Sequence, residues 1–441
     1  MRPGPSSATS PEPQRLRREV GTFGAVMMGL GSIIGTGVFV SIGIAAGITG
    51  PSVVLAVVIG AVVATFNGLS SAQLAANHPV SGGTYEYGYR YLNSWFGFSA
   101  GWLFLLAKSA SAATAALGFA GYALSLLGPR HSAAIVPLAL ALVFALTLTV
   151  LAGMRRSNRA NIVIVSVTLA SLAFFVLVGL PGVFREGLTT FVPFFAPEEG
   201  RGPLSALLYA SALMFVAYTG YGRIATLGEE VKWPRTTIPR AIIAALVVVG
   251  VVYILVSLVG VGVAGTAALS AVQYRAAPLE EVARSFNLGW APHVLAIGAI
   301  TAMVGVLLNL ILGLSRVLMA MGRRRDVPPI FGRLDATGST PTAAVIAVGA
   351  VIAVLAATGN VRTTWSFSAF TVLVYYAITN LAALRLPAEA RYYPRWVAAA
   401  GLASCLLLAF FVERQIWLIG VGLVGAGLLW HAVARRLRSE A

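Results

Sequence analysis

Glycines and small polar residues interrupt two apolar segments in a pattern suited to binding a charged ligand through the backbone. Segment 23–48 contains GSIIGTG at positions 31–37, and segment 205–227 contains YTGYG at positions 218–222. Each glycine in a helix costs about 1 kcal/mol relative to alanine, so both runs predict helix breaks. Unwound backbone inside a membrane is tolerated where it faces protein or a watery cavity. We therefore expect the N–H and C=O groups at these breaks to face a ligand.

The first glycine run has two other possible roles, helix packing and dinucleotide binding. Glycines also form close-packing surfaces between membrane helices, and this alternative stays open for any single glycine. Gly29, Gly31 and Gly35 also resemble a dinucleotide-binding fingerprint, which requires a preceding strand and an acidic residue about 20 positions later. The next acidic residue is Glu86, and the residues between are apolar enough for a membrane. A dinucleotide site is therefore excluded.

Two basic residues lie inside apolar segments, where charge is costly and usually functional. Lys108 lies near the middle of segment 94–127, and Arg223 lies near one end of segment 204–228. Either long side chain can extend its charged end toward the membrane surface, so a structural role stays open for both. For Lys108 we favour a position in a central cavity, as a counter-charge or in place of a coupling cation.

The elements that position these residues are membrane-spanning helices. Of the 441 residues, 58% are hydrophobic and 10% are charged, and the mean hydropathy is +0.84. About 20 apolar residues suffice to cross a bilayer. The twelve predicted spans are 22–48, 51–76, 94–127, 132–153, 160–182, 204–228, 238–264, 288–321, 341–358, 363–385, 394–412 and 415–434. The chain is therefore predicted to be an all-α integral membrane protein.

The net charge of +16 indicates membrane orientation. Basic residues concentrate in the segments that are cytoplasmic when the N-terminus is inside, which is the positive-inside pattern. We therefore expect both termini in the cytoplasm, contacts with anionic lipid and no nucleic-acid partner. Residues 1–19 are predicted to be a disordered tail without a signal peptide. Cys405 is the only cysteine, so no internal disulfide can form.

Four motifs together resemble the amino acid–polyamine–organocation superfamily of transporters. They are GSIIGTGVF from Gly31, PVSGGTYEYGYRY from Pro79, GWLFLL with the later GFAGY in the third span, and AYTGYGRIATLGEEVKWPRTTIPRAI from Ala217. The stretch from Arg316 to Pro329 also resembles the end of the family's eighth span. The order and spacing of these motifs make the resemblance specific over most of residues 20–335.

The resemblance implies a five-plus-five inverted repeat with broken helices 1 and 6 and two peripheral helices. The first repeat would be 20–182 (spans 1–5) and the second 204–385 (spans 6–10). The external loop 183–203 would join them, and 386–441 would hold spans 11 and 12 and a cytoplasmic C-terminus.

The resemblance also implies where an amino acid binds. Its carboxylate would meet the first break, at Ser32, Ile33, Gly35, Thr36 and Gly37. A half-helix N-terminus there would offer N–H groups and a positive dipole end. Its ammonium and side chain would meet the sixth-span break, at Ala217, Tyr218, Thr219, Gly220 and Gly222.

Departures from the family pattern mark candidate gating or coupling positions. Val216 stands where the family often has an aromatic gate, with Phe215 one residue away. Gly222 stands where many members have Asp, and Arg223 follows it. Thr168 falls near a lysine of some proton-coupled members, whereas Lys108 follows the position of a glutamate in some relatives. The coupling ion, H⁺ or Na⁺, is therefore left open.

Acidic residues are absent from the interior of every predicted span. A cationic substrate side chain or a proton relay normally requires a buried carboxylate, so neutral amino acids are slightly favoured. Glu229 and Glu230, which follow span 6, are candidates for an inner gate with Lys232 or with basic loop residues. They are equally well explained as ordinary charges at the membrane interface.

The predicted function is a permease of the cytoplasmic membrane that moves amino acids by alternating access. Alternatives are an exchanger or importer of cationic amino acids or polyamines, and a membrane sensor or channel with a transporter fold. A membrane enzyme is disfavoured because His78, His131, His293 and His431 are scattered and form no metal-ligand pair. No nucleotide-phosphate motif occurs either, and no cofactor or metal is predicted.

Overall fold

The protein is a bundle of long helices. The computed structural model describes residues 20–80, 82–127, 133–153, 158–186, 189–228, 230–270, 277–335 and 340–439. The predicted tail 1–19 lies outside these ranges. No strand is found within them, and one isolated bridge pairs Val20 with Val231. The all-α class is confirmed for these ranges.

The α-helices of the first half are α1 (Thr22–Ile33), α2 (Ile42–Thr49), α3 (Val53–Asn77), α4 (Thr84–Tyr91), α5 (Ser94–Ser125), α6 (Ile135–Leu151) and α7 (Asn158–Glu186). Those of the second half are α8 (Pro203–Tyr218), α9 (Gly222–Ala225), α10 (Pro234–Ser270), α12 (Pro278–Arg284), α13 (Ala291–Arg323), α14 (Thr342–Ala357), α15 (Val361–Leu384), α16 (Arg395–Ala409) and α17 (Arg414–Ser439). Shorter turns are η1 (Gly37–Ser41), η2 (Gly50–Ser52), η4 (Thr189–Phe191), η5 (Thr219–Tyr221), η6 (Pro329–Gly332) and η7 (Ala388–Ala390).

Eight stretches of the described residues are long and apolar enough to cross a membrane. The first, Thr22–Asn77, covers two of the predicted spans, and three shorter apolar helices (α6, α14 and α16) occupy predicted spans 4, 9 and 11. The chain is therefore a multi-pass membrane protein. Twelve crossings and the inverted repeat stay predictions.

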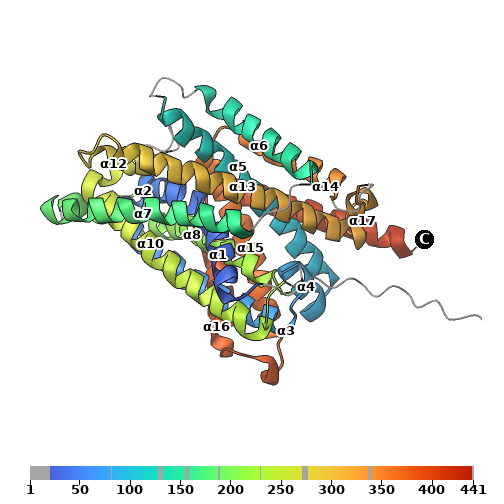
Figure 1. Ribbon diagram of the computed structural model, residues 1–441. Coiled ribbons are helices and arrows are strands. Elements are labelled where there is room, and N and C mark those ends of the chain that lie inside the picture. Colours follow the sequence, from blue (N-terminus) through green and yellow to red (C-terminus); the bar gives the residue numbers. More distant parts are fainter. Residues whose placement is uncertain are drawn as a thin grey trace, which may run out of the picture.

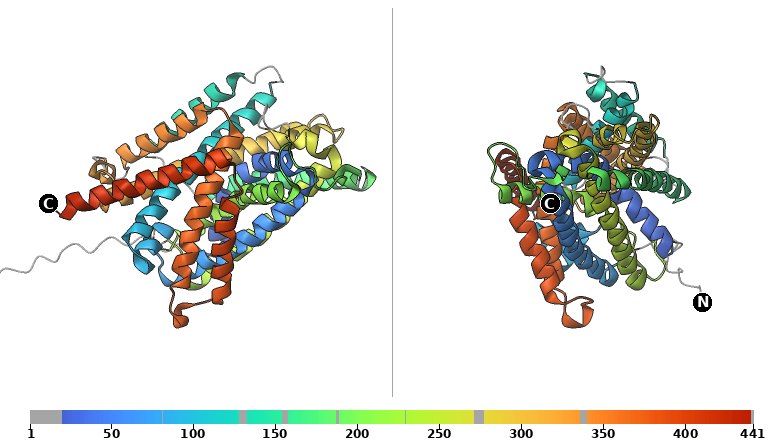
Figure 2. Two further views of the ribbon diagram at one scale, coloured as in Figure 1. Left: turned by 180° about the vertical axis from the view of Figure 1, so that it is seen from behind. Right: turned by 90° about the vertical axis from the view of Figure 1, so that its left-hand side faces the viewer.

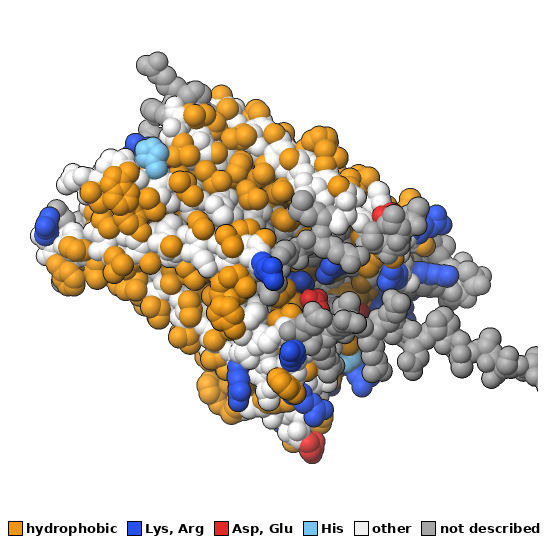
Figure 3. All heavy atoms as spheres, in the orientation of Figure 1, with side chains coloured by type: hydrophobic (Ala, Val, Ile, Leu, Met, Phe, Trp, Pro, Cys, Tyr) orange, Lys and Arg blue, Asp and Glu red, His pale blue; other side chains and the backbone are white. Residues whose placement is uncertain are grey.

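The outer surface of the bundle is apolar over its middle. Large side chains such as Phe144, Leu177, Val247, Val354 and Leu429 are exposed. Figure 3 shows orange side chains across the middle of the displayed face, while most blue ones gather toward one end. Exposed apolar side chains at this density suit contact with lipid tails.

The helices around the two breaks form the centre of the bundle. α5 packs along α13 and α15, and α3 packs along α10 and α8. α6 and α14 pair at one edge, α16 covers α15 and α3, and α17 lies against α5 and α15 (Figures 1 and 2). The segments α1, α2 and α8 therefore lie inside a frame of longer helices.

Asparagine caps begin the two frame helices that supply several pocket side chains. The Asn93 side chain accepts hydrogen bonds from the backbone of Trp95 and Phe96 at the start of α5, at 3.0 and 3.2 Å. Asn360 accepts one from the backbone of Thr363 at the start of α15 at 3.0 Å. Each cap satisfies N–H groups that the helix leaves unpaired.

The bundle has two ends, which we name by their short helices. The α4 end holds α4, η6 and the C-terminal part of α17; the α12 end holds α12, η4 and the segment 193–202 (Figure 1). The positive-inside pattern predicts that the α4 end faces the cytoplasm.

This orientation predicts the labelling of two exposed positions. Cys405 is fully buried, so a membrane-impermeant maleimide should spare the native chain. Glu199→Cys at the α12 end should be labelled in intact cells, whereas Arg333→Cys at the α4 end should require permeabilised cells. The opposite pattern would contradict the orientation.

Candidate functional site

The first break is short and starts later than the glycine run. α1 continues through Gly31 and ends at Ile33, and Ile34 has extended backbone (φ −80°, ψ 110°). The carbonyl of Gly35 accepts hydrogen bonds from the backbone of Val38 and Phe39, both at 3.1 Å. The π-helical turn η1 then leads into α2. The break predicted by GSIIGTG is thus present, centred on residues 34 and 35.

The second break is a tightening of the helix. α8 ends at Tyr218, the 3₁₀ turn η5 follows, and α9 is a single turn. Thr219 has φ −71° and ψ 0°, which differs little from a helical conformation. The sixth span therefore departs from α geometry where YTGYG predicts, but less than an unwound segment would.

The two breaks touch each other through their glycines. A Cβ atom on Gly220 would lie 2.2 Å from the carbonyl oxygen of Ser32, and one on Gly37 would lie 2.7 Å from the Cβ of Ala217. Real Cβ atoms do not approach so closely, and the contact at Ser32 is with rigid backbone. Only glycine fits at position 220 without moving one break away from the other.

A pocket with an empty volume of about 380 Å³ lies where the breaks meet. Nine of the predicted site residues line it: Ser32, Ile33, Thr36, Gly37, Lys108, Val216, Ala217, Thr219 and Gly220. Ser111, Val306, Leu310 and Trp365 complete the lining. The structure thus brings both breaks and the partly buried Lys108 together at one site.

Lys108 of α5 supplies the positive charge of this pocket. Its Nζ donates to Oγ1 of Thr219 at 2.9 Å, and that hydroxyl donates to the carbonyl of Val216 at 2.8 Å. No Asp or Glu is among the lining residues. Thr36 also lines the pocket, and its buried Oγ1 has no hydrogen-bond partner among the described residues. The pocket lining therefore includes an ammonium and a hydroxyl without a described partner.

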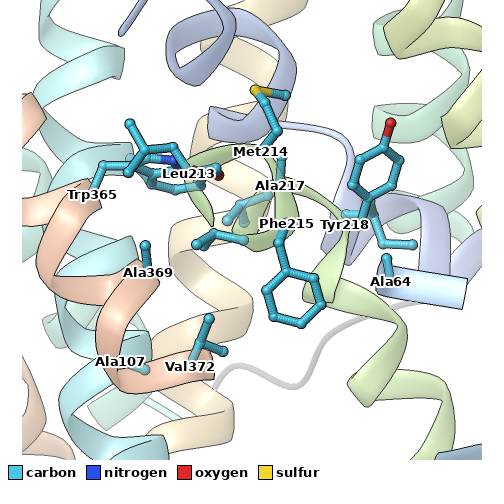
Figure 4. Packing of buried hydrophobic residues seen from close by; sticks show 14 of the residues in the cluster. Ala64, Ala107, Leu213, Met214, Phe215, Ala217, Tyr218, Trp365, Ala369 and Val372 are labelled. Atoms are coloured by element: carbon cyan, nitrogen blue, oxygen red, sulfur yellow. Dashed lines mark hydrogen bonds between the residues drawn. The ribbon is translucent and has the colours of Figure 1, made fainter. Parts of the chain in front are cut away.

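Of the two candidate gate residues, Val216 lies at the pocket and Phe215 does not. Val216 lines the pocket, whereas Phe215 is fully buried with its ring 5.6 Å from the ring of Tyr376. Figure 4 shows Phe215 and Tyr218 of α8 and the facing Trp365 of α15. Nε1 of Trp365 donates to the carbonyl of Leu213 at 3.1 Å, so α15 supplies an aromatic wall where Val216 is small.

Other predicted residues lie outside the pocket lining. Gly35 lies against Val306, and Gly222 lies against the Tyr376 hydroxyl. The Tyr218 hydroxyl donates to the carbonyl of Val57 in α3 at 3.2 Å.

Three of the predicted gating or coupling residues also lie outside the pocket lining. Thr168 donates to the carbonyl of Ile164 within α7, and Arg223 contacts Thr226. Backbone hydrogen bonds join Glu230 to Val20 and Leu227. Glu229 lies outside the described residues.

Tyrosines from neighbouring helices supply hydrogen bonds to the breaks, which the sequence reasoning missed. Tyr253 of α10 donates to the carbonyl of Ile33 at 3.0 Å and lies 3.3 Å from that of Ala217. Tyr376 of α15 donates to the carbonyl of Thr219 at 3.1 Å. A tyrosine in the middle of an apolar span indicates such a role from sequence, because a buried hydroxyl usually requires a hydrogen-bond partner.

Charged and aromatic residues form a network at the α12 end. Arg362 donates to both carboxylate oxygens of Glu198 at 2.8 and 2.9 Å, and to Glu413 at 2.7 Å. Arg201 also pairs with Glu198 at 2.6 Å and lies over the ring of Tyr209. Arg362 is one helical turn from Trp365, so this network connects directly to the pocket wall.

A second network lies at the α4 end. Arg324 pairs with both oxygens of Glu86, at 2.8 and 2.9 Å, and lies over the ring of Tyr89. The buried carboxylate of Asp326 accepts from the hydroxyls of Tyr85 and Tyr89, both at 2.7 Å. Each end of the bundle therefore carries a network of charged and aromatic side chains.

The amino acid permease family matches residues 24–435 of the chain. An uncharacterised transporter of Mycobacterium tuberculosis is 39% identical over 429 residues, 97% of this chain and 94% of the relative. The branched-chain amino acid permease BcaP of Bacillus subtilis is 30% identical over 366 residues (79% and 76%). A vacuolar cationic amino acid transporter of Arabidopsis thaliana is 28% identical over 361 residues (78% and 59%).

Substitution of Gly220 tests the contact between the breaks. Gly220→Ala should lower the free energy of unfolding by about 1–3 kcal/mol, the usual cost of overpacking. It should also reduce amino acid uptake at least tenfold. The control is Gly313→Ala in α13, where a Cβ atom meets nothing within 4 Å. Uptake and a melting temperature equal to the native values in Gly220→Ala would contradict the contact.

The Glu198 network predicts a pH dependence of stability. Burial raises the pKa of Glu198, but hydrogen bonds from Arg362 and Arg201 outweigh this, so its pKa lies below the usual value. A lowered native pKa stabilises the fold above the unfolded pKa of about 4.3. That stabilisation should be lost as the pH falls from there through the native pKa.

Melting curves at a series of acidic pH values check this. The native protein should lose more stability on acidification than Glu198→Gln, in which the titrating group is absent. The exposed neighbour Glu199→Gln is the control and should follow the native curve. Equal acid sensitivity of the native protein and Glu198→Gln would contradict the role of Glu198.

Proposed function

Because the chain belongs to the amino acid permease family, we propose that it is a secondary active transporter that moves amino acids across the cell membrane by alternating access. Family membership confirms the predicted resemblance and the prediction of a transporter rather than an enzyme. The main support for this proposal is that both breaks and Lys108 line one pocket.

The proposed binding mode uses groups common to all amino acids. The α-carboxylate would bind at Thr36 and Gly37, where the second half of span 1 begins and its dipole is positive. The α-ammonium would bind at the carbonyls that end α8. The side chain would then face Lys108, Val216 and Trp365, which line the remaining wall.

Alternating access is supported by the placement of the pocket. It lies between the Arg362–Glu198 network at one end and the Arg324–Glu86 network at the other. Opening one network at a time would expose the pocket to one side of the membrane. In this proposal the two inverted repeats, 20–182 and 204–385, move relative to each other, with both termini in the cytoplasm.

Neutral substrates are favoured by the charge of the pocket. Lys108 would repel a cationic side chain, and no lining carboxylate offsets it. Two unit charges of the same sign 4 Å apart repel by about 4 kcal/mol at an effective dielectric constant of 20. The branched-chain permease among the relatives agrees with this preference, and the cationic transporters represent the alternative.

Uptake of labelled amino acids into proteoliposomes tests the proposal. Saturable uptake with counterflow is expected, whereas a channel would show no counterflow and a sensor no uptake. Repeating the assay with Na⁺ or pH gradients identifies the coupling ion. Absence of amino acid uptake under all gradients would contradict the proposal.

Substitution of Lys108 tests the charge preference. Lys108→Gln should improve lysine uptake relative to leucine uptake about tenfold or more, because the repulsion is removed. Lys108→Arg retains the charge and should retain discrimination against lysine. An unchanged lysine-to-leucine ratio in Lys108→Gln would show that Lys108 does not select substrates.

A further inference from the structure

Tyr253 reaches both breaks with one hydroxyl group. Its oxygen lies 3.0 Å from the carbonyl oxygen of Ile33 and 3.3 Å from that of Ala217. A phenol has a single proton to donate, so the two carbonyls share it. Ile33 and Ala217 both line the pocket, one from each break.

These two carbonyls need donors because of their positions. Ile33 is the last residue of α1, and Ala217 is the next to last of α8. The final carbonyls of a helix lack partners within that helix, so they need donors from the following turn, a neighbouring helix, enclosed water or a ligand. A carbonyl oxygen has two lone pairs, so each can accept from Tyr253 and still bind a second donor.

The surroundings of Tyr253 fix its hydroxyl. The side chain is fully buried, and its ring centre lies 5.1 Å from that of Tyr218. A Cβ atom on Gly37 would lie 3.0 Å from the Tyr253 oxygen. α10 packs along α1 and α3, so the hydroxyl is held by a long frame helix.

Two other described tyrosine hydroxyls near the breaks each bond to a single carbonyl. The Tyr376 hydroxyl bonds to Thr219 of the second break, and the Tyr218 hydroxyl bonds to Val57 of α3. The shared bond of Tyr253 instead sets the direction of one carbonyl relative to the other.

We propose that Tyr253 is a positioning residue for substrate binding. It holds the carbonyls of Ile33 and Ala217 at the separation and orientation where a substrate α-ammonium binds both through their remaining lone pairs. The inference rests on the proposed function, since it requires an amino acid in the pocket. Because every amino acid has this ammonium, loss of the Tyr253 hydroxyl weakens the binding of every substrate by the same factor.

Kinetics of Tyr253→Phe in proteoliposomes test this proposal. The KM should rise about tenfold, the effect of losing one hydrogen bond to a buried group, and by the same factor for substrates with small, branched and aromatic side chains. The maximal rate should stay within about twofold of the native rate. Tyr253→para-aminophenylalanine keeps a donor at the same place and should restore the native KM.

The control is Tyr87→Phe in α4, which removes the hydroxyl of an equally buried tyrosine away from the breaks. It should leave the KM unchanged. If Tyr253→Phe does not fold, Tyr253→para-fluorophenylalanine fills the hydroxyl's space without a donor and serves for the same comparison.

Three outcomes would overturn the role of Tyr253. They are a native KM in the variant without a donor, a KM change that differs among side chains, and an equal KM increase in Tyr87→Phe. Each of these leaves the proposed function intact as long as the native protein transports amino acids. Failure of the native protein to transport any amino acid would instead remove the proposed function itself.

Discussion

Two helices end in the middle of an apolar bundle, and the backbone groups that they leave unpaired constrain the centre of this protein. Inside a bilayer, such groups must be satisfied by protein, enclosed water or a ligand. The protein meets this constraint partly, through Tyr253, Tyr376 and Thr219. The groups that remain face a pocket, so the requirement that shapes the breaks also creates a binding surface.

The same constraint explains the close approach of the breaks. Gly220 lies against the Ser32 backbone, and Gly37 lies against Ala217, so neighbouring donors can reach both helix ends together. The frame helices α5, α10 and α15 bring Lys108, Tyr253 and Trp365 to this point. Charged networks occupy the two ends of the bundle instead, where the surrounding solvent lowers the cost of charge.

Local sequence was sufficient to predict the class of the fold and the positions of both breaks. Glycine runs and apolar segments can be recognised from neighbouring residues alone. Nine of the site residues predicted in this way and by family resemblance line the pocket. The partners Tyr253, Trp365 and Val306 were not predicted, because their roles depend on packing between distant helices. Gly222 and Thr168 were chosen by likeness to the family, and the structure places both outside the lining. Only three-dimensional contacts separate Val216 at the pocket from Phe215 behind it.

We propose that the paired breaks bind the α-carboxylate and α-ammonium that all amino acids share. Competition in a counterflow assay tests it most directly, with a transported neutral amino acid, its amide and its N-acetyl derivative as competitors. The amide lacks the carboxylate, and the N-acetyl derivative lacks the ammonium. Both derivatives should compete at least about a hundredfold more weakly than the parent, since each loses a charge-assisted set of hydrogen bonds. Competition by either derivative as strong as that of the parent would contradict it.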